Sequence, residues 1–418
     1  MRGIRPLRHQ TLLVHVAFPA VAGVIVIARR PDAFSNPQFY AEDGARWFSD
    51  AYNHGSSAIL VSNAGYLQLL PRLVAYVSSP VGAVNAPTFF NVIGLLVQVA
   101  PALFFVTARF RHVVPSLWVR AGLAAIYLLM PSSELNVTIT NAQWHLVILA
   151  VLVVLAAPSP RGYWRVFDVL VVTLSALSGP FAFILLPLAV VWLIAARERW
   201  TLVLVAALGI ALVVQLYSLT HSLRPALALG ASLHDFILLI SDRIILAGLF
   251  AEEGHAHVFV AGTTHGTIIA AAVCAVGALV VLVAALRAPM QLRLFGLAAL
   301  AIAAAGLLSP LVSATGNQWQ LMATSAAGER YFFMAQVAWV VTLVWVLTHV
   351  RRRTPRLAAL GLVGACFLSG VVTGWPYPAF VDYHWQRVAQ LITTSPRGTH
   401  VVAPVPPGPP WVVDVTVR

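Results

Sequence analysis

Long apolar segments, unbroken by charge, follow one another along almost the whole chain, and this feature restricts the fold more than any other. Of the 418 residues, 60% are hydrophobic and only 10% are charged, whereas a soluble domain usually carries about 25% charged residues. So much apolar surface needs a lipid bilayer as its solvent, and backbone polar groups then pair within helices or a closed barrel. Because the segments do not alternate as barrel strands do, the sequence predicts an all-α integral membrane protein.

Eleven apolar segments are predicted to cross the membrane. Several are shorter than the ~20 residues that cross a bilayer alone, so protein or a water-filled cavity must cover their ends. The first segment has no small-residue cleavage site before Arg29, which favours a retained helix over a signal peptide. The two segments that meet at Ser178-Gly179-Pro180 form either a hairpin or one kinked helix. The predicted spans are residues 11–28, 82–106, 118–130, 144–157, 166–178, 181–195, 200–220, 267–286, 294–309, 331–348 and 357–375.

The distribution of charge predicts the orientation. With eleven spans, 16 of the 26 Arg lie on the short loops of one side, which the positive-inside rule makes cytoplasmic. The N-terminus is then inside and the C-terminus outside, and a hairpin at Ser178 is favoured because one kinked helix would place the later Arg clusters outside. Since 12 of the 14 acidic residues fall on the outer side, the net charge of +12 reflects orientation. We therefore expect no nucleic-acid partner.

Polar residues collect on the outer side, in the long loops 29–81, 221–266 and 310–330. We expect one polytopic transmembrane domain, residues 1–375, whose long first outer loop contains short interfacial helices. An outer-face tail, 376–418, is expected to contain an amphipathic helix from Trp385 and an extended proline-rich segment that ends in a short strand. Polar groups on one face predict a protein that works on that face.

The first outer loop contains two adjacent carboxylates, Glu42 and Asp43, followed by a glycine and flanked by aromatic residues. Two acids this close repel each other, so one can keep a raised pKa and act as a general base. The alternative is the start of a helix, where acidic residues interact favourably with the helix dipole. Both interpretations stay open from the pair alone.

Two outer segments place an Arg near a Tyr. Residues 65–72 predict a short interfacial helix with Tyr66 at headgroup level and Arg72 facing a phosphate. Arg330 and Tyr331 stand at the outer mouth of the tenth span, where an Arg can bind a lipid phosphate. The alternatives are that Arg72 extends toward lipid headgroups and that Arg330 pairs with a nearby acid.

The loop before the fourth span is rich in amides and hydroxyls and ends in Asn141, Gln143, Trp144 and His145. The three polar side chains can line a cavity and bind sugar hydroxyls, with the Trp as a stacking face. Helix capping by Asn141 and an interfacial Trp would explain the same residues. In the loop 221–266, His255 and His257 with two nearby acids leave a metal site open, although the spacing is not HExxH and no second ligand pair is evident. The alternative is a flexible solvated loop.

Together these features resemble the GT-C superfamily of polytopic membrane glycosyltransferases, in an uncharacterised bacterial branch. The resemblance rests on the cytoplasmic N-terminus, the first helix, and the long outer loop with an acidic pair. It extends to short later spans and an Arg at the mouth of a late helix. The matching motifs are Glu42-Asp43-Gly44, Gly65-Tyr66 with Pro71-Arg72, Gln143-Trp144-His145, Ser178-Gly179-Pro180-Phe181 and Glu329-Arg330-Tyr331-Phe332.

The resemblance implies a transferase of the bacterial cytoplasmic (inner) membrane whose active site faces outward. The donor would be a sugar on a polyprenyl phosphate, and the acceptor a cell-envelope glycan or lipid. No cofactor is assigned, and a divalent cation is left open. The implied catalytic residues are Asp43 as base and Glu42 as its partner, and the substrate-binding residues are Arg330, Arg72, Tyr66, Asn141, Gln143, His145 and Tyr331.

Three other functions remain open. A transporter or flippase of lipid-linked saccharides needs polar residues along a path to the cytoplasm, and the cytoplasmic halves of the spans offer few. A glycan polymerase or ligase would rely on paired outer-loop Arg residues, for which Arg224 and Arg243 are candidates. A structural membrane subunit would tolerate substitutions in its polar loops.

Overall fold

The structure, a computed structural model, describes residues 16–225, 227–252 and 264–418. It divides into two compact units. Unit 1 comprises the described residues of Met1–Arg109 together with Leu135–Arg224 and Pro376–Arg418. Unit 2 comprises the described residues of Phe110–Glu134 and Pro225–Trp375. The C-terminal tail thus belongs to the same unit as the first outer loop.

Each of the eleven predicted spans overlaps a helix, and residues 11–15 of the first span lie outside the described residues. Hydrophobicity located the elements because an apolar segment has no polar alternative to internal backbone pairing. The helices in chain order are α2 Phe18–Arg29, α6 Gly82–Val106, α7 Leu117–Leu129, α8 Ala142–Leu155, α9 Gly162–Leu177, α10 Ala182–Ala196, α11 Arg199–His221, α15 Thr264–Arg287, α16 Met290–Leu308, α18 Phe333–Thr348 and α19 Arg353–Thr373.

Within the part of the chain that the structure describes, five helical stretches are long and apolar enough to cross a membrane: Leu69–Val106, Arg199–His221, His265–Arg287, Met290–Leu308 and Arg353–Thr373. Their surfaces expose large apolar side chains such as Leu96, Ile210, Leu279 and Leu362. Apolar side chains in such numbers on an outer surface are stable when lipid rather than water surrounds them. The predicted class, a helical membrane protein, is supported at this level.

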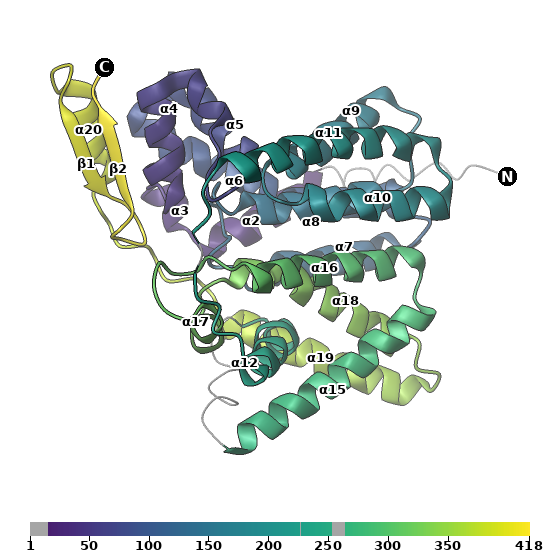
Figure 1. Cartoon of the computed structure of the whole chain (residues 1–418). Coiled ribbons are helices and arrows are strands. Elements are labelled where there is room, and N and C mark those ends of the chain that lie inside the picture. Colours follow the sequence, from purple (N-terminus) through teal and green to yellow (C-terminus); the bar gives the residue numbers. More distant parts are fainter. Residues whose placement is uncertain (1–15, 226, 253–263) are drawn as a thin grey trace. The chain divides into compact units, whose positions relative to one another are not determined.

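Helices α8 to α11 form the bundle of unit 1 (Figure 1). Helix α8 is its central member, because 12 of its 14 residues are buried and it packs against α6, α9 and α10. The chain breaks after α9 and restarts at α10, and α8 and α11 each pack against both of these helices. Two helices that share both neighbours lie side by side, so the Ser178 segment is a hairpin rather than a kink.

The first outer loop folds into short helical segments, as predicted. They are α3 Asp32–Ser35, the π-helix η2 Asp43–Phe48, α4 Ser49–His54, the 3-10 helix η3 Gly55–Leu60, α5 Leu69–Val77 and the 3-10 helix η4 Ser79–Val81. The predicted helix over residues 65–72 is wrong in its start. Asn63 and Tyr66 instead close a tight turn through Ala64 and Gly65, both at positive φ, and α5 begins only at Leu69.

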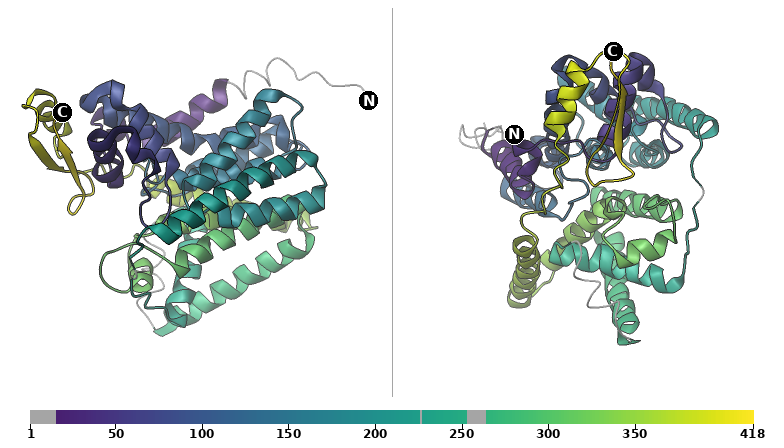
Figure 2. Two further views of the ribbon diagram at one scale, coloured as in Figure 1. Left: turned by 45° about the horizontal axis from the view of Figure 1, so that its top comes forward. Right: turned by 90° about the vertical axis from the view of Figure 1, so that its left-hand side faces the viewer.

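The tail packs onto this loop. Helix α20, Trp385–Thr394, buries Trp385, Val388, Ala389 and Ile392, the spacing of one helix face. Strands β1 His400–Pro404 and β2 Val412–Thr416 form an antiparallel pair in which alternate residues are buried. One strand was predicted and two form, because the proline-rich segment turns the chain back. The hairpin packs against η2 and α4, and α20 against α6 (Figure 2).

Unit 2 is built around α18, which packs against α15, α16 and α19. Its outer segments are also helical in short pieces: α12 Leu233–Leu238, the π-helix η6 Leu239–Leu246, α13 Ala247–Phe250, α17 Gln318–Thr324 and the 3-10 helix η7 Glu329–Tyr331. The 3-10 helix η5, Ala108–Phe110, stands at the boundary between the two units.

Candidate active site

Asp43 is the first residue of η2 and is only 1% exposed. Its Oδ1 accepts hydrogen bonds from the Thr140 backbone N–H and the Thr140 hydroxyl, both at 2.7 Å. Its Oδ2 accepts one from the Ile139 N–H at 3.2 Å. The first outer loop is thereby tied to residues 139–140, nearly 100 positions later in the chain.

The Thr140 hydroxyl is oriented by a second partner. Trp47, one helical turn after Asp43, donates its indole N–H to the Thr140 Oγ1 at 2.9 Å. Because that oxygen accepts from Trp47, its own proton points to the Asp43 carboxylate. Asp43, Thr140 and Trp47 therefore form one directed chain of hydrogen bonds, and all three donors to Asp43 are electrically neutral.

Burial raises the pKa of Asp43 to about 7. The hydrogen bonds from Thr140 and Ile139 oppose this shift, and the negative charge of the neighbouring, half-buried Glu42 adds to it. A carboxyl with a pKa near the working pH can take up and release a proton during a reaction. The geometry therefore provides a titrating group in the first outer loop, at the position that the sequence predicted as a base.

Arg72, a predicted phosphate ligand, is 3% exposed in α5. Its guanidinium forms an ion pair with Asp50 at 2.5 Å, donates to the Val61 carbonyl at 3.2 Å and lies 4.8 Å from the Trp47 ring. These contacts brace the loop behind Trp47. A phosphate can reach this guanidinium only if Asp50 gives way, so phosphate binding by Arg72 stays a prediction.

Tyr66 is half-buried at the end of its turn, near Arg224. The guanidinium of Arg224 lies 5.8 Å from the Tyr66 ring and donates to the Ala64 carbonyl at 2.9 Å. A Cβ on Gly65 would approach the Arg224 side chain to 3.1 Å, so the glycine leaves room for the stem of this Arg. Arg224 holds the turn in place here.

Asn141, Gln143 and His145 lie at the start of α8 and are all buried. Asn141 occupies the N-cap position, but its side chain makes no capping hydrogen bond. The Gln143 amide packs tightly against the hairpin turn at Gly179. A Cβ added to Gly179 would lie only 2.7 Å from the Gln143 Oε1. These three predicted sugar ligands are enclosed by protein, and their role stays a prediction.

Gln215 was missed by the sequence analysis. It is fully buried in α11, accepts from the Leu67 N–H and donates to the carbonyls of Leu67, Ala176 and Gly179. It therefore fastens the hairpin turn to the segment before α5. A single amide inside the apolar run of residues 200–220 was the available signal.

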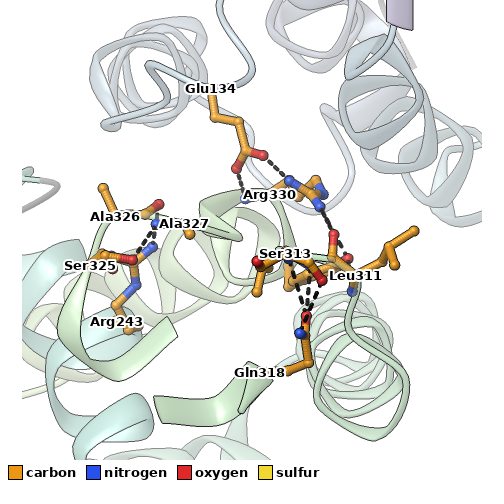
Figure 3. Close-up of polar contacts among 11 residues, drawn as sticks. Glu134, Arg243, Leu311, Ser313, Gln318, Ser325, Ala326, Ala327 and Arg330 are labelled. Atoms are coloured by element: carbon orange, nitrogen blue, oxygen red, sulfur yellow. Dashed lines mark hydrogen bonds and ion pairs between the residues drawn. The ribbon is translucent and has the colours of Figure 1, made fainter. Parts of the chain in front are cut away.

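Arg330 and Tyr331 belong to unit 2, in η7 (Figure 3). Arg330 forms an ion pair with Glu134 and donates to the Leu311 carbonyl at 2.5 Å. The Tyr331 hydroxyl accepts from the Leu311 N–H at 2.9 Å. Pairing with an acid was the alternative considered for Arg330. Its side chain keeps 20% of its surface exposed, so a ligand can still contact it.

The rest of the same loop is held by amide and guanidinium groups (Figure 3). Arg243 donates to the carbonyls of Ser325 and Ala326 at 3.0 and 3.1 Å, and Gln318 accepts from the Val312 N–H at 2.9 Å. These bonds satisfy backbone groups of an irregular segment that would otherwise be left without partners. Arg243 thus braces this segment, and the polymerase or ligase hypothesis stays a prediction.

A small polar pocket opens in unit 1 beside the segments that hold Asp43. Its free space is small, with room for about one water molecule, and it opens to solvent. Tyr40, three residues before Asp43, and Thr138, directly before Ile139, both line it. The full lining is Arg30, Asp32, Ala33, Asn36, Gln38, Tyr40, Asn91, Asn136, Val137, Thr138 and Phe380. This pocket uses residues 136–138 rather than the predicted Asn141, Gln143 and His145.

Metal binding gains no support from the described residues. Across residues 16–225, 227–252 and 264–418, no three His, Cys, Asp or Glu side chains gather in a way that could hold a metal ion. His255 and His257 lie outside the described residues. Comparisons with protein-family models, curated proteins and solved structures find no match for this chain.

Proposed function

We propose that this chain is a membrane glycosyltransferase with eleven spans, an inner N-terminus and an active site on the outer face of a bacterial inner membrane. It moves a sugar from a polyprenyl phosphate to a hydroxyl of a cell-envelope glycan or lipid. The observation that carries the proposal is the buried Asp43, whose pKa is raised to about 7 in the first outer loop next to a polar pocket.

The proposed chemistry is an inverting displacement. The acceptor oxygen bonds to the anomeric carbon as the bond from that carbon to the phosphate oxygen breaks, and polyprenyl phosphate leaves with the electron pair. The acceptor proton passes to Asp43. The reactive atom on this side is Oδ2, because among the described residues it accepts a single hydrogen bond, from Ile139, whereas Oδ1 accepts two.

Glu42 has a supporting role in this proposal. Burial brings the pKa of Asp43 near neutral pH, and the negative charge of Glu42 adds a smaller upward contribution. Arg72, in the same unit as Asp43, and Arg330, in unit 2, are the two candidates for the donor phosphate; the Arg330 side chain is 20% exposed and that of Arg72 is 2% exposed. A guanidinium beside the leaving phosphate would stabilise the developing charge.

Mass spectrometry of lipids and glycans from the source organism tests the proposal. Wild type is compared with Asp43→Asn and with Glu42→Gln, each at equal membrane level and with its melting temperature measured. We expect Asp43→Asn to lose one sugar from a surface glycan and to accumulate the polyprenyl-phosphate donor. Glu42→Gln should retain transfer, with its activity profile shifted to lower pH, because removing a neighbouring negative charge lowers the pKa of Asp43.

One result would contradict the catalytic role of Asp43. If Asp43→Asn leaves the glycans unchanged while deletion of the whole gene alters them, Asp43 has only a structural role. The transport of lipid-linked saccharides would then become the leading function. A melting temperature of Asp43→Asn close to that of wild type is needed for the first outcome to count as loss of chemistry.

A further inference from the structure

The hydrogen-bond chain at Asp43 begins at a tryptophan to which the sequence analysis gave no role. Trp47 is 0% exposed and belongs to η2, the same π-helix that Asp43 opens. Its indole N–H lies 2.9 Å from the Thr140 Oγ1, and that hydroxyl lies 2.7 Å from the Asp43 Oδ1. π-Helices are rare and occur frequently at functional sites. One turn of this helix supplies both ends of the chain.

The Thr140 hydroxyl has to be held in place if it is to reach Asp43. A threonine side chain has more than one staggered position about χ1, and rotation would carry the hydroxyl away from the carboxylate. The same rotation would break the bond from Trp47, which would leave a buried indole N–H without a partner at a cost in free energy. Accepting from the indole also polarises the hydroxyl and strengthens its own donation. Trp47 therefore favours the arrangement in which Thr140 donates to Asp43.

The Trp47 ring is held in turn by Arg72. The guanidinium lies over the ring, 4.8 Å from its centroid, and is itself fixed by the Asp50 carboxylate at 2.5 Å and the Val61 carbonyl at 3.2 Å. A cation against an indole face is a favourable contact, and more so where water is excluded. Because Arg72 is only 3% exposed, it fixes the ring from a buried position.

The charges around Asp43 leave this hydrogen bond in a controlling position. Helix η2 packs against α4, α5 and β2. Asp50 and Arg72 pair with each other, so their charges largely cancel. Burial raises the pKa of Asp43, the Thr140 hydroxyl opposes this most strongly, and Glu42 adds a smaller upward contribution. The charged groups on these elements and beside Asp43 are Asp50, His54, Arg72, Asp414, Glu42 and Arg46.

We propose that Trp47 is a positioning residue for the base: it holds the Thr140 hydroxyl on Asp43, and Arg72 holds Trp47. Trp47 acts on Asp43 only through Thr140. The proposal rests on the proposed function for the role of Asp43 as a base, whereas the coupling it assigns can be measured without sugar transfer. It also gives Arg72 a place in the site that requires no phosphate.

Infrared spectroscopy follows the proton on Asp43 directly, because a protonated carboxyl has a C=O stretching band that a carboxylate lacks. The full chain is titrated in nanodiscs, and subtracting the same protein with Asp43→Asn isolates the band of Asp43. Thr140→Val should raise the pKa of Asp43, so that its proton is bound about tenfold more tightly, because the carboxylate loses a donor. Trp47→Phe should raise it by about threefold in proton affinity, because the hydroxyl is held less firmly.

The double variant Trp47→Phe with Thr140→Val tests whether Trp47 acts through Thr140. Without the hydroxyl, the indole has no route to the carboxylate, so the pKa of Asp43 should equal that in Thr140→Val alone. A further rise, as large as that in Trp47→Phe alone, would show that Trp47 acts independently and would overturn the inference.

Trp385→Phe is the matched control. Trp385 is 2% exposed, donates its indole N–H to the Ala83 carbonyl at 3.0 Å and packs against Phe48 of η2. The variant therefore loses the same kind of bond beside the same helix, but not one that leads to Asp43. The pKa of Asp43 should equal that in wild type.

A second measurement uses wild type, so it does not depend on the folding of a variant at position 47. In NMR spectra of protein with isotopically labelled tryptophan, the Trp47 indole N–H should move with pH at the pKa of Asp43. Its resonance is assigned by its displacement in Thr140→Val. It should not move in Asp43→Asn, and the Trp385 indole should not follow Asp43 in either protein.

Three other results overturn the inference. One is that Trp47→Phe leaves the pKa of Asp43 as in wild type. Another is that Trp385→Phe raises it as much as Trp47→Phe, which would indicate general loosening of the loop. The third is that the Trp47 indole does not follow the titration of Asp43. If the expected shifts occur while Asp43→Asn still transfers sugar, the proposed function fails and the coupling of Trp47 to Asp43 stands.

Discussion

Unit 1 buries two aspartates in opposite ways. Asp168, in α9, is completely buried and forms two hydrogen bonds with the Arg109 guanidinium, at 2.5 and 2.9 Å, and one with the Trp200 indole at 3.3 Å. Asp43 is equally enclosed, yet every donor that bonds to it is neutral. One buried carboxylate is thus matched by a cation, and the other by dipoles alone.

The difference separates a carboxylate held by a cation from one held by neutral donors alone. A paired cation offsets part of the cost of removing a carboxylate from water. Neutral donors offset only part of that cost, so burial raises the pKa of Asp43 to about 7. The Asp168 region therefore serves packing, whereas the Asp43 region keeps a proton-exchanging group at some cost in stability.

The largest expected effect is at the paired aspartate. Arg109→Met leaves Asp168 as a buried charge without its cation, and should destabilise the protein by about 3–5 kcal/mol. Thermal unfolding in nanodiscs measures this. The double variant Arg109→Met with Asp168→Leu should regain most of the loss. If the single variant were as stable as wild type, the contrast between the two aspartates would fail.

The second expected effect is a dependence of stability on pH that comes from Asp43. Because its folded-state pKa is raised from 3.8 to about 7, the folded protein holds this proton more tightly than the unfolded chain. Its contribution to stability therefore decreases as pH rises from about 4 to about 7, by at most about 4 kcal/mol, and is constant above that.

The measurement is the pH dependence of the melting temperature, taken as the difference between wild type and Asp43→Asn. Subtraction removes the other titrating groups, which both proteins share. A difference that does not change between pH 4 and pH 8 would mean that Asp43 titrates in its ordinary range.

The smallest expected effect measures how much the neutral hydrogen-bond donors to Asp43 contribute to stability. Thr140→Val removes a hydroxyl that donates to Asp43 and accepts from Trp47, so it should cost about 1–3 kcal/mol. Thr138→Val, two residues earlier, removes a hydroxyl without a partner among the described residues and should leave the melting temperature unchanged or higher. Equal losses in both variants would show that the bonds to Asp43 do not matter for stability.

Hydrophobicity and periodicity were enough to locate the helices. All eleven predicted spans overlap helices, and the break at Ser178 and the amphipathic helix from Trp385 were predicted correctly. The short turn at Asn63–Tyr66 was not, because its form depends on Ala64 and Gly65 at positive φ and on Arg224, which arrives from the end of α11. A local pattern carries no information about a partner 160 residues away.

The sequence predicted only part of the candidate site. Repulsion between adjacent acids was the reason for predicting a raised pKa in this loop, whereas the pKa of Asp43 is raised chiefly by burial and only secondarily by Glu42. The donors from Ile139 and Thr140 and the pocket lining at Asn136 and Thr138 were not foreseen, since they lie about 100 residues further on. Asn141, Gln143 and His145, the sugar ligands predicted from the sequence, are buried at the start of α8.

The amino-acid pattern alone established a helical membrane protein, because apolar segments of this length and number have one stable arrangement for their backbone in lipid. It also located an acidic pair in a long polar loop. Which of the two acids is buried, and where the tail packs, depended on contacts between distant segments. The tail illustrates this, because Gly44 gives room to Val413 and Asn53 pairs with the backbone of Asp414 and Thr416. Such contacts depend on shape complementarity in three dimensions, which no local pattern of hydrophobicity encodes.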